Sequence, residues 1–337
     1  MSTAEANADE PTRDRAAIDW LLGSNEPGIR LQARRDLLGQ AAADDDAGVL
    51  DGPRVQALFE GQRADGGFGV HAYAKWTGAH WRLVSLVELG VPGGEPRALA
   101  ALETVLDWLT GAGHRRNVPV LAGRARRCAS QEGNALAVAS RLGAADDPRA
   151  RLLAESLVGW QWPDGGWNCD KRAPATHSSF NETVTPLGGL AEFARATSDP
   201  AARAAAQAAA TRTCELLLDH RVYLSHRTGK VGNEKWLELR YPPYWRYDLV
   251  QGLLMLARAG ALPDPRAEQA LALLRERQQP DGRWRLLGGP MWSSSGKYGR
   301  EAVPWERSGP SQMLTLNALR VLRAAGRLAP LHAATAA

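Results

Sequence analysis

The chain has 337 residues, a formal net charge of +4 and three cysteines. The small positive surplus makes nucleic acid or an anionic membrane an improbable partner, and an odd number of cysteines argues against a disulfide framework. No apolar run approaches the roughly 20 residues that a membrane-spanning helix needs, and the first residues do not resemble a signal peptide, so we expect a cytoplasmic protein.

Residues 1–15 are polar and charged, and we expect them to form a disordered N-terminal tail ahead of a single domain over residues 16–328. Alanine and leucine dominate this domain, which favours an all-α fold. The expected helices cover about residues 13–22, 28–39, 53–61, 77–90, 97–110, 130–142, 148–160, 180–196, 201–219, 244–259, 265–277 and 311–326.

Similar stop and start signals separate these helices. Glycines at 90, 143 and 260 follow expected helix ends, and an acidic residue followed by proline comes soon after each of them, as in Asp147-Pro148. Glycine past a helix end and proline in the first turn of the next helix are typical of a join between two helices. The joins therefore predict about six helical hairpins.

A short phrase also occurs three times, as QRADGGF from Gln62, QWPDGGW from Gln161 and QQPDGRW from Gln278. Each copy has a glutamine, an aspartate three residues later, glycine and then an aromatic residue. A phrase repeated at distances of this size indicates an architecture built by repetition. We interpret it as structural, with the glutamine joining helix ends and the aromatic ring packing beside it.

This phrase resembles the QW motif of squalene and hopene cyclases, and the chain from about residue 18 to 326 is similar to the α/α toroid of that superfamily, which protein prenyltransferase β subunits share. The resemblance implies a closed ring of helical hairpins around a central cavity, and an enzyme that acts on a hydrophobic, isoprenoid-type small molecule. Long links between the helices, among them residues 111–127, 168–179 and 220–243, are where we expect the site.

The acid of class II cyclases, which lies in an Asp-x-Asp-Asp motif, has no equivalent in this sequence. The runs Asp44-Asp45-Asp46 and Asp146-Asp147 come nearest, but a solvated link and a helix start account for them. A cluster of cysteine, aspartate and histidine side chains could replace that acid. In prenyltransferases, aspartate, cysteine and histidine hold a zinc ion at the mouth of the toroid.

Cys169, Asp170 and His177 offer those three ligand types, and Cys128 could supply a fourth. Zinc prefers sulfur, nitrogen and carboxylate ligands, so the resemblance implies a zinc cofactor here. Two alternatives stay open: a metal-free catalytic cysteine and histidine, or simple capping and packing. The residues that we propose from sequence as catalytic are Cys169, Asp170, His177, Tyr247 and Asp248.

A second cluster mixes basic and aromatic residues in the link before the helix expected at 244–259. Its arginines could bind an anion while its aromatic rings line an apolar cavity, as a prenyl diphosphate would require. Trp76 and Trp81 begin another buried helix and could add to that lining. The predicted substrate-binding residues are Trp76, Trp81, His226, Arg227, Arg240, Tyr244, Trp245 and Arg246.

Two other classes of function compete with the isoprenoid hypothesis. Six-hairpin barrels also host carbohydrate-active hydrolases and lyases, because tryptophan stacks equally well on sugars, and the carboxylates to test are Glu132, Glu182 and Asp248. The other class is a non-catalytic helical-repeat scaffold.

Overall fold

The computed structural model describes residues 3–40, 45–116, 118–288 and 301–328, and these residues are predominantly helical. Each of the twelve ranges expected from sequence contains or overlaps an observed helix, so the all-α prediction is confirmed for the described part of the chain. Most helix ends agree within three residues. Two helix starts differ by more: α1 begins ten residues earlier than expected, and α11 begins five residues later because Asp248 caps it.

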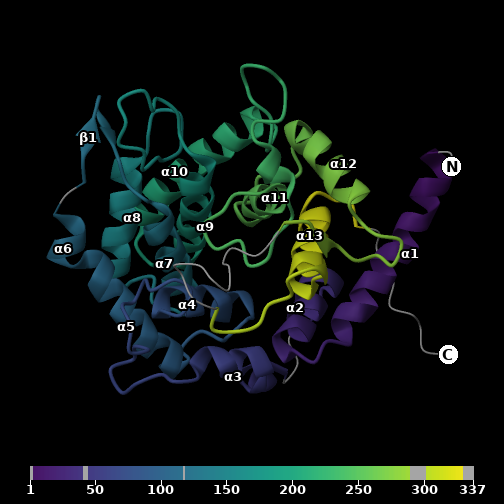
Figure 1. Ribbon diagram of the computed structural model, residues 1–337, viewed down its shortest axis with the longest axis horizontal. Helices are drawn as coiled ribbons and strands as arrows, with labels where there is room; N and C mark the ends of the chain where they lie inside the picture. The colour runs from purple at the N-terminus through teal and green to yellow at the C-terminus, as the bar shows by residue number, and fades with distance from the viewer. Residues whose placement is uncertain (1–2, 41–44, 117, 289–300, 329–337) are drawn as a thin grey trace.

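The major helices alternate along the chain between an outer and an inner layer (Figure 1). The outer helices are α1 (Thr3–Leu22), α3 (Pro53–Phe59), α5 (Pro96–Thr110), α8 (Pro148–Trp160), α10 (Pro200–Asp219) and α12 (Glu268–Glu276). The inner helices are α2 (Pro27–Leu38), α4 (Ala79–Glu88), α7 (Ser130–Arg141), α9 (Phe180–Ala196), α11 (Leu249–Arg258) and α13 (Gln312–Ala324).

Short elements occupy the links between these helices. They are the helix α6 (Ala112–Arg115), the 3-10 helices η1 (Asp45–Asp51), η2 (Glu234–Leu237) and η3 (Pro265–Ala267), and the two-residue strands β1 (Val120–Leu121), β2 (Arg124–Ala125), β3 (Arg285–Leu286) and β4 (Gly309–Pro310). The strands pair antiparallel, β1 with β2 and β3 with β4. Asp44 of the acidic run considered above lies outside the described residues.

Burial separates the two layers. The inner helix α13 buries nine of its thirteen residues, whereas the outer helix α10 buries seven of its twenty and leaves an alanine-rich and charged face in solvent. Inner helices pack against their inner neighbours from α4 through α7, α9, α11 and α13 to α2. Gln32 of α2 completes the series, because its Nε2 donates to the carbonyl of Glu88 in α4 at 3.1 Å.

The predicted joins between helices are present. Gly90, Gly143 and Gly260 follow inner helices with φ angles of +86°, +82° and +74°, a conformation that other residues adopt at a cost. Proline occupies the first turn of the following outer helix, and Asp147 caps α8 by accepting a hydrogen bond from the backbone N–H of Arg149 at 2.7 Å.

The repeated phrase has the structural role that the sequence predicted. Nε2 of Gln161 donates to the carbonyls of Gly165, inside the phrase, and Ala209, in the next outer helix, both at 2.9 Å. Gln62 makes the equivalent bonds from α3 to α5. The indole N–H groups of Trp167 and Trp284 donate back to carbonyls of the preceding helices α8 and α12, at 3.0 and 2.8 Å.

The third copy of the phrase corrects the prediction of a disordered N-terminal tail. Gln278 donates to Asp14 at 3.0 Å, Arg275 pairs with the same carboxylate at 2.6 Å, and Asp14 is only 1% exposed. These contacts hold α1 against the C-terminal end of α12. The helix α1 itself begins at Thr3, within the segment for which a disordered tail was expected. α13 packs against both α1 and α2, and the first and last hairpins are therefore neighbours.

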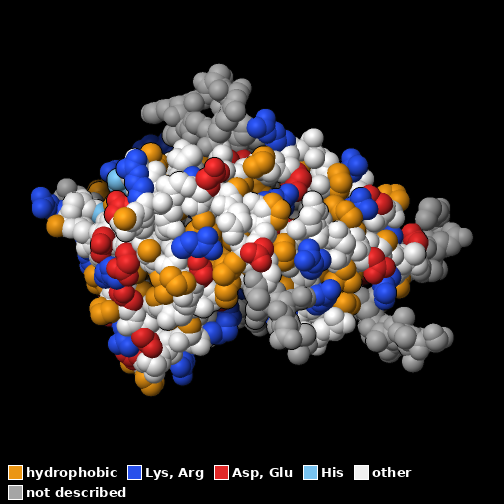
Figure 2. Space-filling view, turned by 90° about the horizontal axis from the view of Figure 1, so that it is seen from below, with side chains coloured by type: hydrophobic (Ala, Val, Ile, Leu, Met, Phe, Trp, Pro, Cys, Tyr) orange, Lys and Arg blue, Asp and Glu red, His pale blue; other side chains and the backbone are white. Residues whose placement is uncertain are grey.

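The described surface mixes charges of both signs. On the face in Figure 2, basic and acidic side chains are interspersed and hydrophobic side chains are scattered between them. No helix among the described residues combines the length and the apolar character that crossing a membrane requires.

Candidate functional site

The links before α7 and α9 bring two cysteines together. A parallel β-bridge joins Arg126 to Asn168, and the backbone N–H of Arg127 donates to the carbonyl of Asn168 at 3.2 Å. Because the two segments run side by side in the same direction, Cys128 lies beside Cys169. The side-chain ligand atoms of Cys128, Cys169 and Glu182 all lie within 4.8 Å of one another, and we call these three residues the thiol–carboxylate cluster.

Glu182 fixes this cluster to the frame. One of its carboxylate oxygens accepts a hydrogen bond from the backbone N–H of Ser130, the first residue of α7, at 3.1 Å, and the other accepts from the Cys169 thiol at 3.4 Å. Glu182 itself belongs to the first turn of α9. The N-terminal ends of two inner helices therefore meet at this carboxylate, where their dipoles favour negative charge.

The three groups of the cluster differ in how their pKa values are shifted. Burial raises the pKa of Glu182 above its usual range, although hydrogen bonds from Ser130 oppose the effect. The hydrogen bond with Cys169 lowers the pKa of Cys128, whereas that bond and burial raise the pKa of Cys169. Cys128 is therefore the thiol that ionises first, and thiolates are the form that binds metals.

A second buried carboxylate lies close enough to influence the cluster. Glu132 accepts hydrogen bonds from Arg127 through Oε1, at 2.8 and 3.0 Å, and His114 Nε2 lies 3.0 Å from the same oxygen. Its Oε2 is buried and has no hydrogen-bond partner. The charge of Glu132 raises the pKa values of Glu182 and Cys128, so a cation in this region would satisfy several groups at once.

Two of the ligands predicted from sequence are not in the cluster. Asp170 binds the neighbouring Arg172, which lowers the pKa of Asp170 to about 2. The His177 side chain is exposed, and its carbonyl accepts a hydrogen bond from Asn168 at 2.7 Å. Of the four predicted ligands, the structure brings Cys128 and Cys169 together, and Glu182 lies beside them in place of Asp170 and His177.

A group of packed aromatic residues reaches the cluster through Tyr73. Tyr73 contacts the rings of His80 and Trp81 at 5.2 and 5.1 Å between ring centroids, and Trp81 contacts Trp76 at 4.9 Å. We call these four residues, together with Tyr244 stacked on Trp76 at 4.4 Å, the aromatic wall. Burial raises the pKa of Tyr73 to about 12, and the charges of Glu182 and Cys128 contribute to that rise, so Tyr73 joins the wall to the cluster.

The aromatic wall contains polar atoms without partners. Trp76 and Trp81 are 3% and 1% exposed, and their indole N–H groups make no hydrogen bond. His80 is 1% exposed, and neither of its ring nitrogens has a partner. Burial lowers the pKa of His80 to about 3, so this imidazole is neutral at pH 7.

Tyr244 also covers an inner cavity of about 60 Å³ between the inner helices. Its hydroxyl donates to Glu301 at 2.7 Å, and its carbonyl accepts a hydrogen bond from Asn134 at 3.4 Å. Most of the lining of this cavity is apolar, as the sequence led us to expect, and Glu88, Arg141 and Arg258 form the charged part of its wall.

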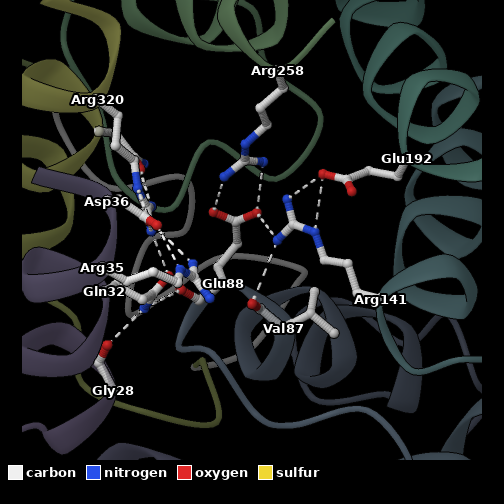
Figure 3. Close-up of polar contacts among 11 residues, drawn as sticks. Gly28, Gln32, Arg35, Asp36, Val87, Glu88, Arg141, Glu192, Arg258 and Arg320 are labelled. Carbon is white, nitrogen blue, oxygen red and sulfur yellow. Dashed lines mark hydrogen bonds and ion pairs between the residues drawn. The ribbon is translucent and has the colours of Figure 1, made fainter. Parts of the chain in front are cut away.

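These charged residues belong to a larger group that the sequence analysis missed. Six inner helices each contribute one charged side chain to it, as Figure 3 shows, and we call this group the central ion cluster. Its members are Asp36 of α2, Glu88 of α4, Arg141 of α7, Glu192 of α9, Arg258 of α11 and Arg320 of α13. On its far side lies a wider cavity of about 600 Å³, the vestibule, which shares Arg141, Glu192 and Arg258 with the inner cavity.

The remaining predicted site residues are dispersed. Tyr247 is buried against the stacked rings of Phe180 and Trp236, and its hydroxyl donates to the carbonyl of Val222 at 2.5 Å. Asp248 caps α11 by accepting a hydrogen bond from Gln251 N–H at 2.9 Å. Both therefore have structural partners.

The predicted anion-binding residues do not form one group. His226 and Arg227 are exposed in the link before η2, whereas Arg240 pairs with Glu238. Arg246 lies near Trp245, 5.8 Å from the ring centroid to its guanidinium carbon, and burial lowers the pKa of Arg246.

Comparison with protein-family models found no match, and a search of curated proteins found none either. What the site can do must therefore be argued from its own chemistry.

Proposed function

We propose that the chain is an enzyme of the terpene cyclase or prenyltransferase type, built as an α/α toroid of six helical hairpins. Its substrate is a hydrophobic, isoprenoid-type small molecule, and a zinc ion assists the reaction. The two alternating layers of helices, the three structural glutamines and the contact between the first and last hairpins support the toroid.

The convergence of Cys128, Cys169 and Glu182 carries the proposal. Two thiols and a carboxylate are donor types that zinc takes, and three protein ligands with one open position are typical of catalytic zinc sites. The unpartnered, buried Oε2 of Glu132 near the cluster also fits a cation. Bound there, zinc would lower the pKa of a thiol or water nucleophile.

The aromatic wall supplies the apolar contacts in this proposal. Tyr73 is half-buried at the edge of the wall, and the buried rings of Trp76 and Trp81 would face a hydrocarbon chain and attract a developing positive charge once the wall opens. Neutral His80 adds no competing charge. Pockets for small molecules usually enclose about 300–1,000 Å³, so the inner cavity of about 60 Å³ is too small for a prenyl chain. In this proposal a substrate is therefore bound only when the wall opens, for which Tyr244, between the wall and the inner cavity, would have to move.

Metal content and ligand retention test the proposal together. We expect about one zinc ion per purified chain, lost in Cys128→Ser, Cys169→Ser and Glu182→Gln. Asp170→Asn and His177→Ala are matched controls, because both residues lie outside the cluster, and these variants should keep the metal. Elemental analysis measures the content. Zinc that is absent from the folded wild type and cannot be loaded would contradict the metal site.

Retention of a fluorescent isoprenoid alcohol tests the substrate class separately. Trp81→Leu keeps much of the buried volume but removes the indole face, and we expect weaker retention without loss of zinc. Equal retention by the wild type and Trp81→Leu would count against the isoprenoid substrate, whatever the metal content.

One observation favours a second candidate, a carbohydrate-active enzyme. Glu132 and Glu182 are both buried near the aromatic wall; Arg127 pairs with Glu132, while burial raises the pKa of Glu182. Two neighbouring carboxyl groups in unlike environments are the arrangement of glycosidases. Glycoside cleavage by a zinc-free chain that disappears in both Glu132→Gln and Glu182→Gln would replace the isoprenoid hypothesis.

A further inference from the structure

The vestibule lies apart from the thiol–carboxylate cluster and has a different chemistry. It encloses about 600 Å³ beside the last turns of the inner helices, a volume within the range of small-molecule sites. Four arginines line it, together with Asp36 and Glu192 as the acidic residues. The arginines are Arg35, Arg141, Arg258 and Arg320. Their side chains are between 13% and 54% exposed, so they remain accessible from the cavity.

Each carboxylate of the central ion cluster is shared by two arginines. Arg258 makes a two-pronged pair with Glu88, at 2.9 and 2.8 Å, and Arg141 donates to the same carboxylate at 2.9 Å (Figure 3). Arg35 and Arg320 share Asp36 in the same way.

Glu192 is shared by Arg141 at 3.0 Å and Arg195 at 3.1 Å. Among the described residues, five guanidinium groups therefore share these three carboxylates, so positive charge is in excess at and beside the vestibule.

In arginine networks on the outer surface, carboxylates outnumber the arginines with which they pair. Arg149 alone pairs with three carboxylates, those of Glu103, Asp107 and Asp147. Arg266 likewise pairs with three. A surplus of guanidinium groups is therefore a local property of the vestibule rather than a general property of this arginine-rich chain.

We propose that the vestibule binds a small dianion of the phosphate type, through Arg35, Arg258 and Arg320. Guanidinium groups present paired N–H donors that match phosphate oxygens, and the negative charge of such an anion would offset the local excess of positive charge. The charge of Arg258 contributes, after burial, to lowering the pKa of Arg320, which indicates repulsion that an anion would relieve. The proposed metal site plays no part in this inference.

Helix dipoles offer a simpler reason for the arginines. The C-terminal ends of the inner helices carry partial negative charge, which attracts basic side chains whether or not a ligand binds. The two explanations differ in what they expect of added phosphate. Compensation of the dipoles gives no affinity for it, whereas a dianion site gives saturable binding.

Calorimetric titration with inorganic phosphate, and separately with pyrophosphate, at constant low ionic strength tests the proposal. We expect saturable binding that Arg35→Gln weakens and Glu192→Gln strengthens, each by roughly threefold to tenfold. A gain in Glu192→Gln is informative because a damaged fold would not produce it. Arg149→Gln is the matched control, and it should leave the affinity unchanged.

Two outcomes would overturn the site: no saturable binding of either anion to the wild type, or binding that Arg35→Gln and Glu192→Gln both leave unchanged. If Glu192→Gln does not fold, Arg320→Lys replaces it. Lysine keeps the positive charge, so the expected loss of affinity would show the contribution of the planar guanidinium donors. Cys128→Ser should bind phosphate as the wild type does. Failure of the zinc proposal and failure of this one are therefore distinguishable.

Discussion

Asp248 combines two opposing effects on one carboxyl group. It is 2% exposed, and burial raises its pKa to about 7 even though the backbone N–H groups of Gln251 and Arg240 donate to it. The sequence predicted a catalytic role for Asp248. Its hydrogen bonds make it the cap of α11, so its ionisation bears on stability.

We expect the contribution of Asp248 to the free energy of unfolding to fall as the pH rises. An unfolded aspartate titrates near pH 3.9, and Asp248 in the folded chain titrates at about 7. Between about pH 4 and pH 7 the folded chain keeps a proton that the unfolded chain has lost, so this residue's contribution to stability falls by up to about 1.4 kcal/mol per pH unit.

Asp248→Asn removes this titration while its amide oxygen can still cap the helix. The free energy of unfolding, measured with urea at several pH values, should therefore favour the variant increasingly as the pH rises from about 5 to 7.5. A difference between variant and wild type that stays constant over this range would refute the assignment.

Within the thiol–carboxylate cluster, the sequence indicated the cysteines but not their partner. Cys128 stands just before the helix expected at 130–142, and Cys169 just after the second copy of the repeated phrase. The sequence therefore led us to expect the two thiols in one site. The choice between His177 and Glu182 depends on which residue enters the first turn of α9. His177 lies before that helix and faces solvent, whereas Glu182 lies within it and points to the start of α7. Local residue chemistry does not reveal that contact.

The repeated phrase acts at the scale of helices. In all three copies the glutamine bonds to the carbonyl of the glycine four residues later and to the next outer helix, but only Gln278 is fully buried with a charged partner. Its glycine, Gly282, has a φ of +80°, and a Cβ there would lie 2.0 Å from the carbonyl oxygen of Arg13. This copy therefore controls how α1 docks.

We expect Gln278→Ala to destabilise the chain more than Gln62→Ala does. Removing the amide takes one hydrogen bond from the buried Asp14 carboxylate, which should cost about 1–3 kcal/mol. Gln62 is more exposed, and water can replace its bonds. Hydrogen exchange should show faster opening of α1 in Gln278→Ala, and urea unfolding gives the free energies. Similar losses in both variants, with α1 protected, would contradict this role.

Helix positions were predictable because helix boundaries are local. Proline, acidic caps and positive-φ glycines act within a few residues, and these signals placed most helix ends correctly. The central ion cluster also left a trace: Glu88, Arg141 and Arg258 each stand two residues before a helix-ending glycine. These residues meet only because six helices converge, and no local sequence pattern predicts that convergence.

At the scale of the whole molecule, the ion pairs of the central ion cluster form two sets that together involve all six inner helices (Figure 3). Its pairs join α4 to α7 and α11 through Glu88, α7 to α9 through Glu192, and α2 to α13 through Asp36. Glu88 of α4 pairs with two of these arginines, Arg141 and Arg258. Burial alone would raise its pKa, but Arg258 and Arg141 outweigh that effect and hold the pKa of Glu88 well below its usual range.

This depression makes acid stability depend on Glu88. An unfolded glutamate titrates near pH 4.3, so the stability that Glu88 contributes is complete above that pH and is lost as the pH falls toward its lower folded value. At pH 7, Glu88→Gln leaves two arginines short of a partner and should cost on the order of 3 kcal/mol.

The gap in unfolding free energy between wild type and Glu88→Gln should therefore shrink below about pH 4, because protonation makes the wild-type side chain neutral as well. Asp107→Asn is the matched control, since it removes an arginine pair of 2.7 Å from the exposed surface, where such pairs contribute little. Urea unfolding of the three proteins across this pH range measures the gap. If Glu88→Gln cost no more than Asp107→Asn at neutral pH, the cluster would not be what holds the inner helices together.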